Sequence, residues 1–324
     1  MTEKDRILNK INCDVSRPVL FSESNGGSEN QLKLLFKHVP DSYFKDINFI
    51  FNNASPDLLE KEKINVLWMH HFVNQEEAKN LGSKDFTDKL DYIIFNSNWN
   101  YEKFQYQFKI PENKSIVIRN AIEKIDNIEK PKDKINLVYH TTPWRGLENL
   151  VKIFNQMNLK DVELNVCSST TIYGNKFNES YKDKFKDIFD ECKNSDNINY
   201  FGYLKNEEVI KLLKKMHIYS FPSIWPETSC ISAIEAMAAG CQIVSTSMGA
   251  LYETCSPFAS FVTFDRDFNN LNKKFQKKLA QSIDNYWSRE NQELLKLQQD
   301  TINRTYSWEV RAKEWIDFLN NIKK

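Results

Sequence analysis

The segment that decides the fold is IYSFPSIWPETSCISAIEAMAAGCQIV, residues 218–244. It predicts a short buried strand at Ile218–Phe221, a polar loop, a helix at Thr228–Ala239 and a second strand at Ile243–Ser245. The helix is apolar on nearly every side, which indicates that it is buried in the protein. A buried helix between two short apolar strands is typical of a parallel α/β sheet.

Two carboxylates of this segment are candidate binding groups. Glu235 lies within the apolar helix, where an unpaired charge is costly, so it needs hydrogen-bond donors. Glu227 lies eight residues earlier, just before the helix. This spacing covers about 12 Å along a helix axis, close to the reach from a hexose ring across a diphosphate to a ribose. Between them, the free backbone amides near Ser229, Cys230 and Ile231 favour an anion.

A purely structural interpretation of the same residues stays open at this point. Thr228 or Ser229 would cap the helix, and Glu227 would complement its dipole. Glu235 would then pair with a Lys or Arg that is distant in the sequence. The spacing alone does not decide between this interpretation and a ligand site.

The same alternation of strand, turn and helix continues along the chain. A polar, lysine-rich stretch at residues 122–134 predicts a linker between two α/β domains. We expect domains at residues 1–125 and 130–290, with helices of residues 291–324 packing back on the first domain; the last of these helices is capped by Ser307. The strands expected in the first domain are Pro18–Phe21, Ile47–Phe51, Val66–Met69, Tyr92–Phe95 and Ser115–Ile118, with helices at Glu29–His38 and Asn98–Phe108. Those expected in the second are Asn136–Tyr139, Glu163–Cys167, Asn199–Phe201, Ile218–Phe221, Ile243–Ser245 and Phe261–Phe264, with helices at Leu147–Met157, Glu179–Cys192, Asn206–Lys215, Thr228–Ala239 and Leu271–Trp287.

Composition excludes several classes of protein. The chain has 324 residues, 44 basic and 44 acidic, and therefore no net charge. This balance argues against a generally basic nucleic-acid binder. No apolar run is long enough to span a membrane, and the charged first twenty residues do not form a signal peptide. The six cysteines show no metal-ligand spacing, so buried, reduced thiols in the cytoplasm are expected.

Several motifs resemble the two-domain retaining glycosyltransferases of the family 4 group, also called glycosyl transferases group 1. Glu227 and Glu235 match the Glu-x7-Glu motif of that group, and EAMAAG (Glu235–Gly240) continues it. Asn25–Glu29 resembles the glycine loop after the first strand, HTTPWRGLENLV (His140–Val151) the first strand–loop–helix of the donor domain, and Asn199–Leu204 the base-contacting loop. The resemblance implies two Rossmann-like domains that face each other across a cleft (the GT-B architecture).

The resemblance also implies roles for the residues that match the donor-site motif. Glu235 would accept hydrogen bonds from the donor ribose, and Glu227 would contact hydroxyls of the transferred sugar. The amides near Thr228, Ser229, Cys230 and Ile231 would hold the diphosphate. Arg145 would neutralise charge on the leaving diphosphate in place of a metal, so no metal and no cofactor is expected.

Weaker signals give further candidate residues. The backbone near Tyr203 and Leu204 would contact the base. One of His70 and His71, which follow a strand, would contact the donor sugar, with a slight preference for His71; a structural histidine is the alternative. Gly26 and Gly27 would allow the backbone to approach a substrate, unless they form an ordinary strand–helix turn.

Two departures from the family pattern concern the diphosphate site. The family usually has a second basic residue before the position of Arg145, where this chain reads Tyr139-His140-Thr141-Thr142. Many members have Phe-Gly where this chain has Ser229-Cys230. The first of these differences puts a clamp of two cations on the diphosphate in doubt.

The function implied is a retaining, metal-independent transfer of a hexose from a UDP- or GDP-sugar to a glycan, a lipid-linked acceptor or another hydroxyl. Two alternatives stay open: a non-catalytic nucleotide-sugar- or glycan-binding subunit, and a sugar-nucleotide epimerase of the same fold. No nucleic-acid partner is expected, and contact with a membrane is at most peripheral. A nicotinamide oxidoreductase is disfavoured because the chain has no G-x-G-x-x-G motif.

Overall fold

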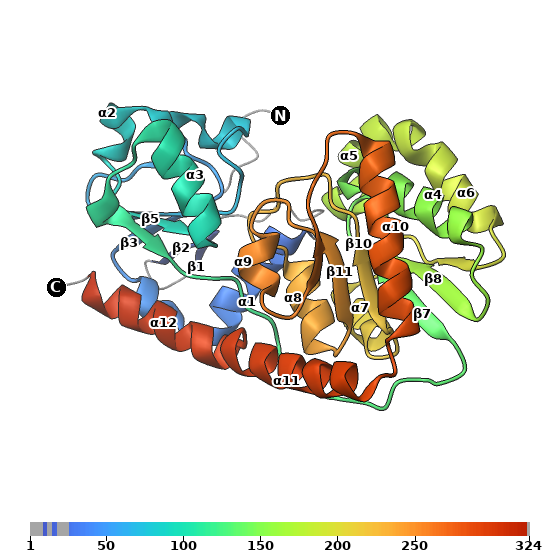
Figure 1. The fold of residues 1–324 in the computed structure, drawn as a ribbon. Helices are drawn as coiled ribbons and strands as arrows, with labels where there is room; N and C mark the ends of the chain where they lie inside the picture. Colours follow the sequence, from blue (N-terminus) through green and yellow to red (C-terminus); the bar gives the residue numbers. More distant parts are fainter. Residues whose placement is uncertain (1–8, 12–14, 18–25, 323–324) are drawn as a thin grey trace. The chain divides into compact units, whose positions relative to one another are not determined.

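The computed structural model describes residues 9–11, 15–17 and 26–322 of the chain. The chain divides into two compact units (Figure 1). The first comprises the chain up to Ala121 together with the residues from Trp308 onward, and the second comprises Ile122–Ser307. Each unit contains a mainly parallel sheet with helices, so the predicted α/β fold class is confirmed.

The second unit contains a six-stranded, fully parallel sheet in the order β12-β11-β10-β7-β8-β9. The strand order reverses between β7 and β10, which makes the sheet doubly wound. Its strands are β7 (Ile135–Tyr139), β8 (Val162–Val166), β9 (Ile198–Tyr200), β10 (Ile218–Phe221), β11 (Gln242–Thr246) and β12 (Ser260–Val262).

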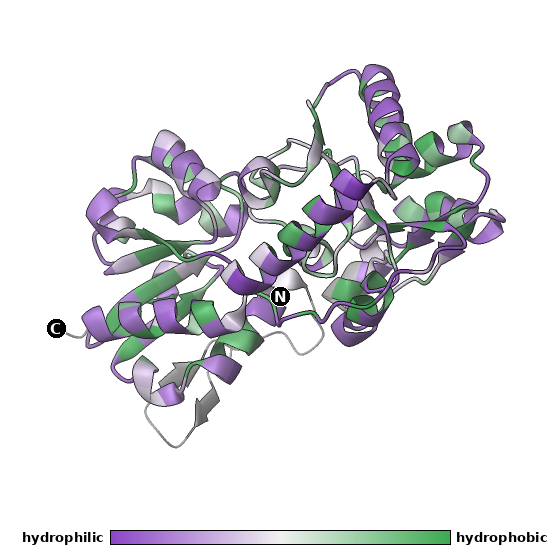
Figure 2. Ribbon diagram, turned by 60° about the horizontal axis from the view of Figure 1, so that its bottom comes forward, coloured by the Kyte–Doolittle hydropathy of each residue, from purple (hydrophilic) through white to green (hydrophobic). Residues whose placement is uncertain are grey.

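Helices cover both faces of this sheet, and the apolar strands form the buried centre of the unit (Figures 1 and 2). One face carries α4 (Leu147–Met157), α6 (Lys186–Asn194) and α10 (Phe268–Asp284). The other carries α7 (Asn206–Leu213), α8 (Ile231–Ala238), α9 (Leu251–Cys255) and α11 (Arg289–Thr305). Because α8 lies between the sheet and α11, its apolar sequence is explained by burial on all sides.

The first unit has its strands in chain order, from β1 to β6, with an antiparallel β1–β2 pair and parallel pairing after it. They are β1 (Asn9–Ile11), β2 (Val15–Arg17), β3 (Ile47–Phe51), β4 (Ile64–Met69), β5 (Tyr92–Phe95) and β6 (Ser115–Val117). Alternate residues of β4 separate two cores, as strand geometry requires. Val66 and Trp68 pack toward α1 (Gly27–His38) and α12 (Trp308–Asn321), and Leu67 and Met69 pack with residues of α2 (Lys84–Thr87) and α3 (Asn98–Phe108).

The remaining helical elements are short. They are α5 (Asn175–Tyr181) and 3₁₀ turns at Asp41–Phe44, Pro56–Leu58, Glu76–Gly82, Glu112–Lys114, Pro143–Arg145, Thr171–Tyr173 and Asp183–Phe185.

Two expected helices differ in the structure by more than small shifts of their ends, and one expected strand is not described. The single helix expected at Glu179–Cys192 is broken into α5, a 3₁₀ turn and α6. The helix expected from Thr228 starts at Ile231, because Cys230 has a left-handed backbone conformation that ends the helix there. The strand expected at Pro18–Phe21 lies outside the described residues.

The expected boundaries also differ at the linker and at the C-terminus. Ile122 and Ile125 of the linker are buried in the core of the second unit. The Nζ of Lys130 donates to the carbonyls of Met216 (2.5 Å), Ala239 (2.7 Å) and Leu213 (3.2 Å), which attaches the linker to this unit. Helix α11 belongs to the second unit, where it packs on α8, whereas α12 belongs to the first.

Candidate functional site

The candidate site of the second unit lies where the strand order of its sheet reverses. β7 and β10 are adjacent strands on either side of this point, and a loop begins at the carboxyl end of each. In open α/β sheets, ligands bind at this position because the two loops diverge and leave a crevice. The loop after β7 carries Arg145, and the loop after β10 carries Glu227.

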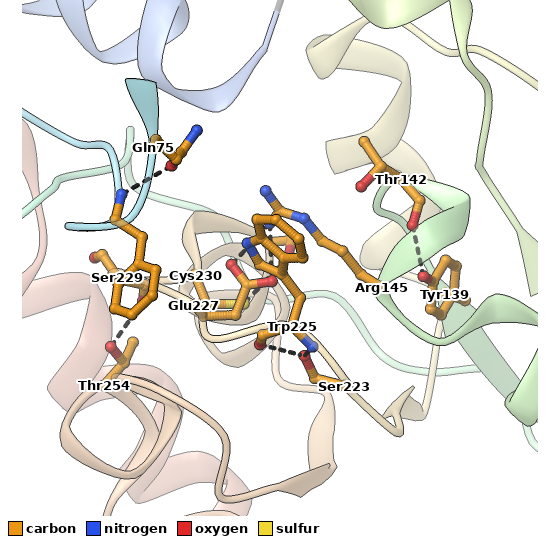
Figure 3. Close-up of polar contacts among 12 residues, drawn as sticks. Gln75, Tyr139, Thr142, Arg145, Ser223, Trp225, Glu227, Ser229, Cys230 and Thr254 are labelled. Carbon is orange, nitrogen blue, oxygen red and sulfur yellow. Dashed lines mark hydrogen bonds and ion pairs between the residues drawn. The ribbon is translucent and has the colours of Figure 1, made fainter. Parts of the chain in front are cut away.

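Arg145 and Glu227 form a direct ion pair (Figure 3). The Nη1 of Arg145 donates to both carboxylate oxygens of Glu227, at 2.9 Å and 2.7 Å. The Glu227 side chain is 4% exposed and that of Arg145 is 24% exposed. Burial raises the pKa of Glu227, and Arg145 opposes that rise. The guanidinium is thus held in place while part of it stays open to a ligand.

Two glycines allow the loops to approach each other closely. Gly146 has a φ of 120°, and a Cβ at this position would lie 2.3 Å from the carbonyl oxygen of Pro222. Gly249 has a φ of 67°, and its Cβ would lie 2.4 Å from both the nitrogen and the oxygen of Glu227. The backbone of Ala250 donates to the Glu227 carbonyl at 2.7 Å, next to a bridge between Glu227 and Gly249. The backbone of Glu227 is therefore fixed by the loop after β11.

Hydroxyl side chains hold the rest of the loop after β10. The Oγ of Ser223 bonds to the backbone of Trp225 and closes a tight turn (Figure 3). The Oγ1 of Thr254, on α9, donates to the carbonyl of Ser229 at 2.7 Å. These contacts hold the loop that leads from Glu227 to α8 in one conformation.

The start of α8 presents free amides without a side-chain cap. Cys230 is the N-cap residue, with φ 63° and ψ 70°, and no side chain caps the helix. Neither Thr228 nor Ser229 is therefore the cap, contrary to the structural interpretation above. The first amides of a helix have no acceptor within it, so those of Ile231 and Ser232 can donate to an anion. Cys230 thus has a left-handed conformation, which glycine adopts without strain.

Glu235 does not pair with a Lys or Arg among the described residues. Its Oε1 accepts a hydrogen bond of 2.7 Å from the Nδ2 of Asn206, the first residue of α7. The side chain is buried, and burial raises its pKa to about 7, with the Asn206 bond acting in the opposite direction. A buried carboxylate held by one neutral donor still has unused capacity to accept hydrogen bonds.

Tyr203 and Leu204 lie in the loop that joins β9 to α7. Tyr203 is exposed, as is Phe201 beside it, and Gly202 between them has a φ of 65°. This loop leads directly to Asn206, so it is connected to Glu235 through a single side chain.

His140, which stands near the position of the family's second cation, is buried against the ring of Tyr219. Burial lowers its pKa to about 4, so it is neutral at pH 7. At neutral pH, Arg145 is therefore the charged member of the loop after β7.

The two candidate histidines, His70 and His71, have different environments in the first unit. His70 is buried against Trp68 and Phe51, and burial lowers its pKa to about 3. His71 is 27% exposed, with its Nδ1 3.6 Å from the carboxylate of Glu77. Burial lowers the pKa of His71, and the nearby Glu77 opposes this effect. His70 thus has the surroundings of a structural residue, whereas His71 is accessible to a ligand.

Gly26 and Gly27 lie at the start of α1 in the first unit. Gly26 is its N-cap residue, with a φ of −64°, a conformation open to any residue. The backbone conformation therefore gives no reason for a glycine at position 26.

Sequence reasoning missed the residues that support the site rather than line it. Asn206, Gly249 and Thr254 each contact a predicted residue from a different element. Gly146, which follows Arg145 directly, could have been recognised because a lone glycine after a candidate residue often marks a close backbone approach. Nothing in the sequence indicated the partners of the other three.

The described residues offer neither a cluster of metal ligands nor a membrane-spanning helix. Within residues 26–322 and the two short strands before them, no group of three or more His, Cys, Asp or Glu side chains could hold a metal ion. None of the described helices is long and apolar enough to cross a membrane.

One family model matches the chain, and several solved structures share its fold. The model of the family described as glycosyl transferases group 1 matches residues 118–298. A glycosyltransferase from Rickettsia africae is 15% identical, with a TM-score of 0.67 over 94% of this chain and 84% of that chain. HepE from Anabaena, solved in complex with UDP-glucose, is 13% identical, with a TM-score of 0.65 over 92% and 84%. Sucrose-phosphate synthase from Thermosynechococcus elongatus is 17% identical, with a TM-score of 0.64 over 89% and 79%. No curated protein sequence matches the chain.

Proposed function

Because the chain belongs to the glycosyl transferases group 1 family and is a GT-B glycosyltransferase, we propose that it is retaining, independent of a metal and specific for a nucleotide-sugar donor. The observation that carries the proposal is the Arg145–Glu227 ion pair, placed where the strand order reverses and followed by the uncapped start of α8. Along the chain, Glu227, the uncapped start of α8 and Glu235 follow one another in the order of the sugar, the diphosphate and the ribose of a nucleoside diphosphate sugar, and Arg145 is paired with Glu227.

The diphosphate binds at the start of α8 in this proposal. The amides near Ile231 donate to its oxygens, and the positive end of the helix dipole adds to the attraction. Arg145 is already held by Glu227, so it loses little conformational freedom when the ligand arrives. As the bond between the sugar and the phosphate breaks, Arg145 stabilises the charge that develops on the leaving phosphate.

Glu227 has two roles in this arrangement. Its carboxylate orients Arg145, and it accepts hydrogen bonds from hydroxyls of the transferred sugar. Glu235 accepts hydrogen bonds from the ribose. The loop around Tyr203 and Leu204 contacts the base.

The transfer proceeds with retention of configuration by attack on the front face of the sugar. The anomeric carbon loses its bond to the phosphate oxygen and gains a bond to the acceptor oxygen on the same face. The proton of the acceptor hydroxyl passes to the leaving phosphate, so no side-chain nucleophile is assigned. Arg145 and the start of α8 supply the positive charge that a divalent metal supplies in other transferases.

The first unit presents the acceptor. His71 is a candidate contact of the donor sugar, and the start of α1 at Gly26 and Gly27 is a candidate contact of a substrate. The acceptor is a glycan, a lipid-linked sugar or another hydroxyl compound. The donor is a UDP- or GDP-sugar; UDP is tested first because HepE was solved with UDP-glucose. The five described cysteines are buried and form no disulfide, which supports a reducing compartment such as the cytoplasm.

A thermal-shift screen with UDP, GDP, ADP and their sugars, with and without EDTA, tests the donor site. A ligand at a hundred times its Kd stabilises the fold by about 2.7 kcal/mol, which is easily measured. A shift with one nucleotide that EDTA does not change supports a site without a metal. If EDTA abolishes the shift, metal independence is wrong.

A transfer assay then separates the enzyme from its alternatives. We expect Glu227→Ala and Glu235→Ala to reduce turnover strongly, and the exposed Asn155→Ala to leave it unchanged. Unchanged turnover in both glutamate variants contradicts the proposed site. Binding without transfer or donor hydrolysis indicates a non-catalytic subunit, and donor conversion without an acceptor indicates an epimerase. NMR of the product's anomeric proton decides between retention and inversion.

A further inference from the structure

Asn206 makes a contact that the proposed reaction has not yet used. It is the first residue of α7, and its Nδ2 donates to the Oε1 of Glu235, on α8, at 2.7 Å. The two residues are 29 positions apart in the sequence, so the tertiary structure alone brings them together. The bond joins the loop that contains Tyr203 to the helix that follows Glu227.

The two ends of this hydrogen bond have different environments. Glu235 is 7% exposed, whereas Asn206 lies at the surface. A carboxylate accepts through both oxygens, and a single amide proton uses one of them. No hydrogen bond to the Oε2 of Glu235 is found among the described residues, and this atom is not enclosed. The side chain is thus oriented by one oxygen and open at the other.

Charged neighbours do not orient Glu235. The pKa of its carboxyl is influenced by burial and by Asn206. Hydrogen bonds from α11 to the backbone of α8 come from the neutral side-chain amides of Gln298, Gln299 and Asn303. None of the charged groups on the elements around α8 influences this pKa. These groups are Glu207, Glu208 and Lys211 on α7, Glu253 on α9, Arg289, Glu290, Glu293, Lys296, Asp300 and Arg304 on α11, Glu227 before the start of α8, and Lys130 of the linker, which bonds to the Ala239 carbonyl.

We propose that Asn206 is a positioning residue for the donor ribose: it holds Oε1 of Glu235 so that Oε2 faces the ribose hydroxyls, while its own Oδ1 remains available to the second hydroxyl. This inference rests on the proposed function, because it assumes that Glu235 binds a ribose. A vicinal diol has two donors, and the Asn206–Glu235 pair offers two acceptors side by side. The pair therefore selects ribonucleotides over 2′-deoxyribonucleotides.

The test measures Kd by calorimetry for UDP and 2′-deoxy-UDP with the full chain, its Asn206→Ala and Asn206→Asp variants and a matched control. Asn206→Asp keeps the shape of the side chain but removes the N–H donor. The control is Asn155→Ala, because Asn155 makes a similar amide bond of 2.8 Å to the carboxylate of Glu191 on the surface of the same unit. We expect Asn206→Ala to weaken UDP binding about fivefold or more, as loss of a hydrogen bond to a charged group does.

Two further readouts distinguish positioning from a structural role. The ratio of the Kd for 2′-deoxy-UDP to the Kd for UDP should be smaller in Asn206→Ala than in the wild type. Such a change is expected when the Asn206 side chain and the 2′-hydroxyl act together in binding. The pH at which UDP binding is half-maximal should also rise, because the Asn206 bond lowers the pKa of Glu235.

The outcomes separate this inference from the proposed function. Equal Kd values and pH profiles in the wild type and both Asn206 variants overturn it. An equal loss for UDP and 2′-deoxy-UDP at every pH assigns Asn206 a structural role and also overturns it. Failure of the wild type to bind UDP or GDP overturns the proposed nucleotide site, and with it the ribose assignment.

Discussion

Gly249 offers the sharpest test of how the site is built, because it would not contact a ligand in the proposed site. Its φ of 67° is left-handed, and a Cβ would lie 2.4 Å from the backbone nitrogen and oxygen of Glu227. Ordinary contacts of a Cβ begin at 3.4 Å. Gly249→Ala therefore forces the backbone of Glu227 to move by about 1 Å, a displacement that in an active site costs roughly 100-fold in rate.

Gly240→Ala is the matched control for this change. Gly240 also has a left-handed backbone, with a φ of 74°, but its Cβ would meet only the side chain of Gln299, at 3.5 Å or more. Both substitutions place an alanine in the left-handed region, which costs about 1–2 kcal/mol. In a unit of this size, each kcal/mol lowers Tm by about 2–4 °C. Gly240→Ala should therefore reduce stability with little change in turnover.

Turnover, UDP affinity and Tm of both variants give the answer. We expect Gly249→Ala to lose at least as much stability as Gly240→Ala and, in addition, about 100-fold in turnover. If the two variants keep equal turnover at a temperature where both are folded, then the close approach of Gly249 to Glu227 does not position the site, and the reasoning is refuted.

Three other changes have defined outcomes. Glu235→Gln should stabilise the fold above pH 7 while weakening UDP binding. The native pKa of Glu235, about 7, exceeds its ordinary value of 4.5, so the native state holds a proton that the unfolded chain loses. Stability therefore falls between pH 4.5 and 7, by about 3 kcal/mol. Urea titrations at pH 4 and pH 8 should show a gain only at pH 8. Arg145→Ala should lower the free energy of unfolding by about 3–5 kcal/mol, since it leaves the buried Glu227 carboxylate unpaired. Adding Glu227→Gln to this variant should restore Tm but not turnover. An unchanged Tm in the single variant would contradict the buried ion pair. Lys130→Ala should lower the free energy of unfolding by about 2–3 kcal/mol, because it removes a charged donor from three carbonyls. Substitution of the exposed Lys132 by alanine should change it almost not at all. Equal denaturation midpoints of the two variants would show that Lys130 does not anchor the linker.

The strands and most helices could be predicted from local patterns. Runs such as Ile47–Phe51 and Tyr92–Phe95 appear in the structure with the bounds expected, as do the helices Leu147–Met157 and Asn98–Phe108. Such elements depend on short-range periodicity, which the sequence displays directly. The break between α5 and α6 was missed, since no glycine or proline marks it.

The sequence by itself determined the family, the α/β class and the position of Glu227 and Glu235 on either side of a helix start, because motif spacing and the apolar helix are local properties of the chain. Only the tertiary structure decided what each of these residues contacts. Arg145 lies 82 positions from Glu227, Asn206 lies 29 positions from Glu235, and Gly249 meets the backbone of Glu227 from another loop. These contacts depend on the order in which the strands assemble, which places the loops after β7, β10 and β11 side by side. Hydrogen bonds and close approaches between distant segments leave no periodic signal in the sequence, and for that reason they had to be seen in the folded chain.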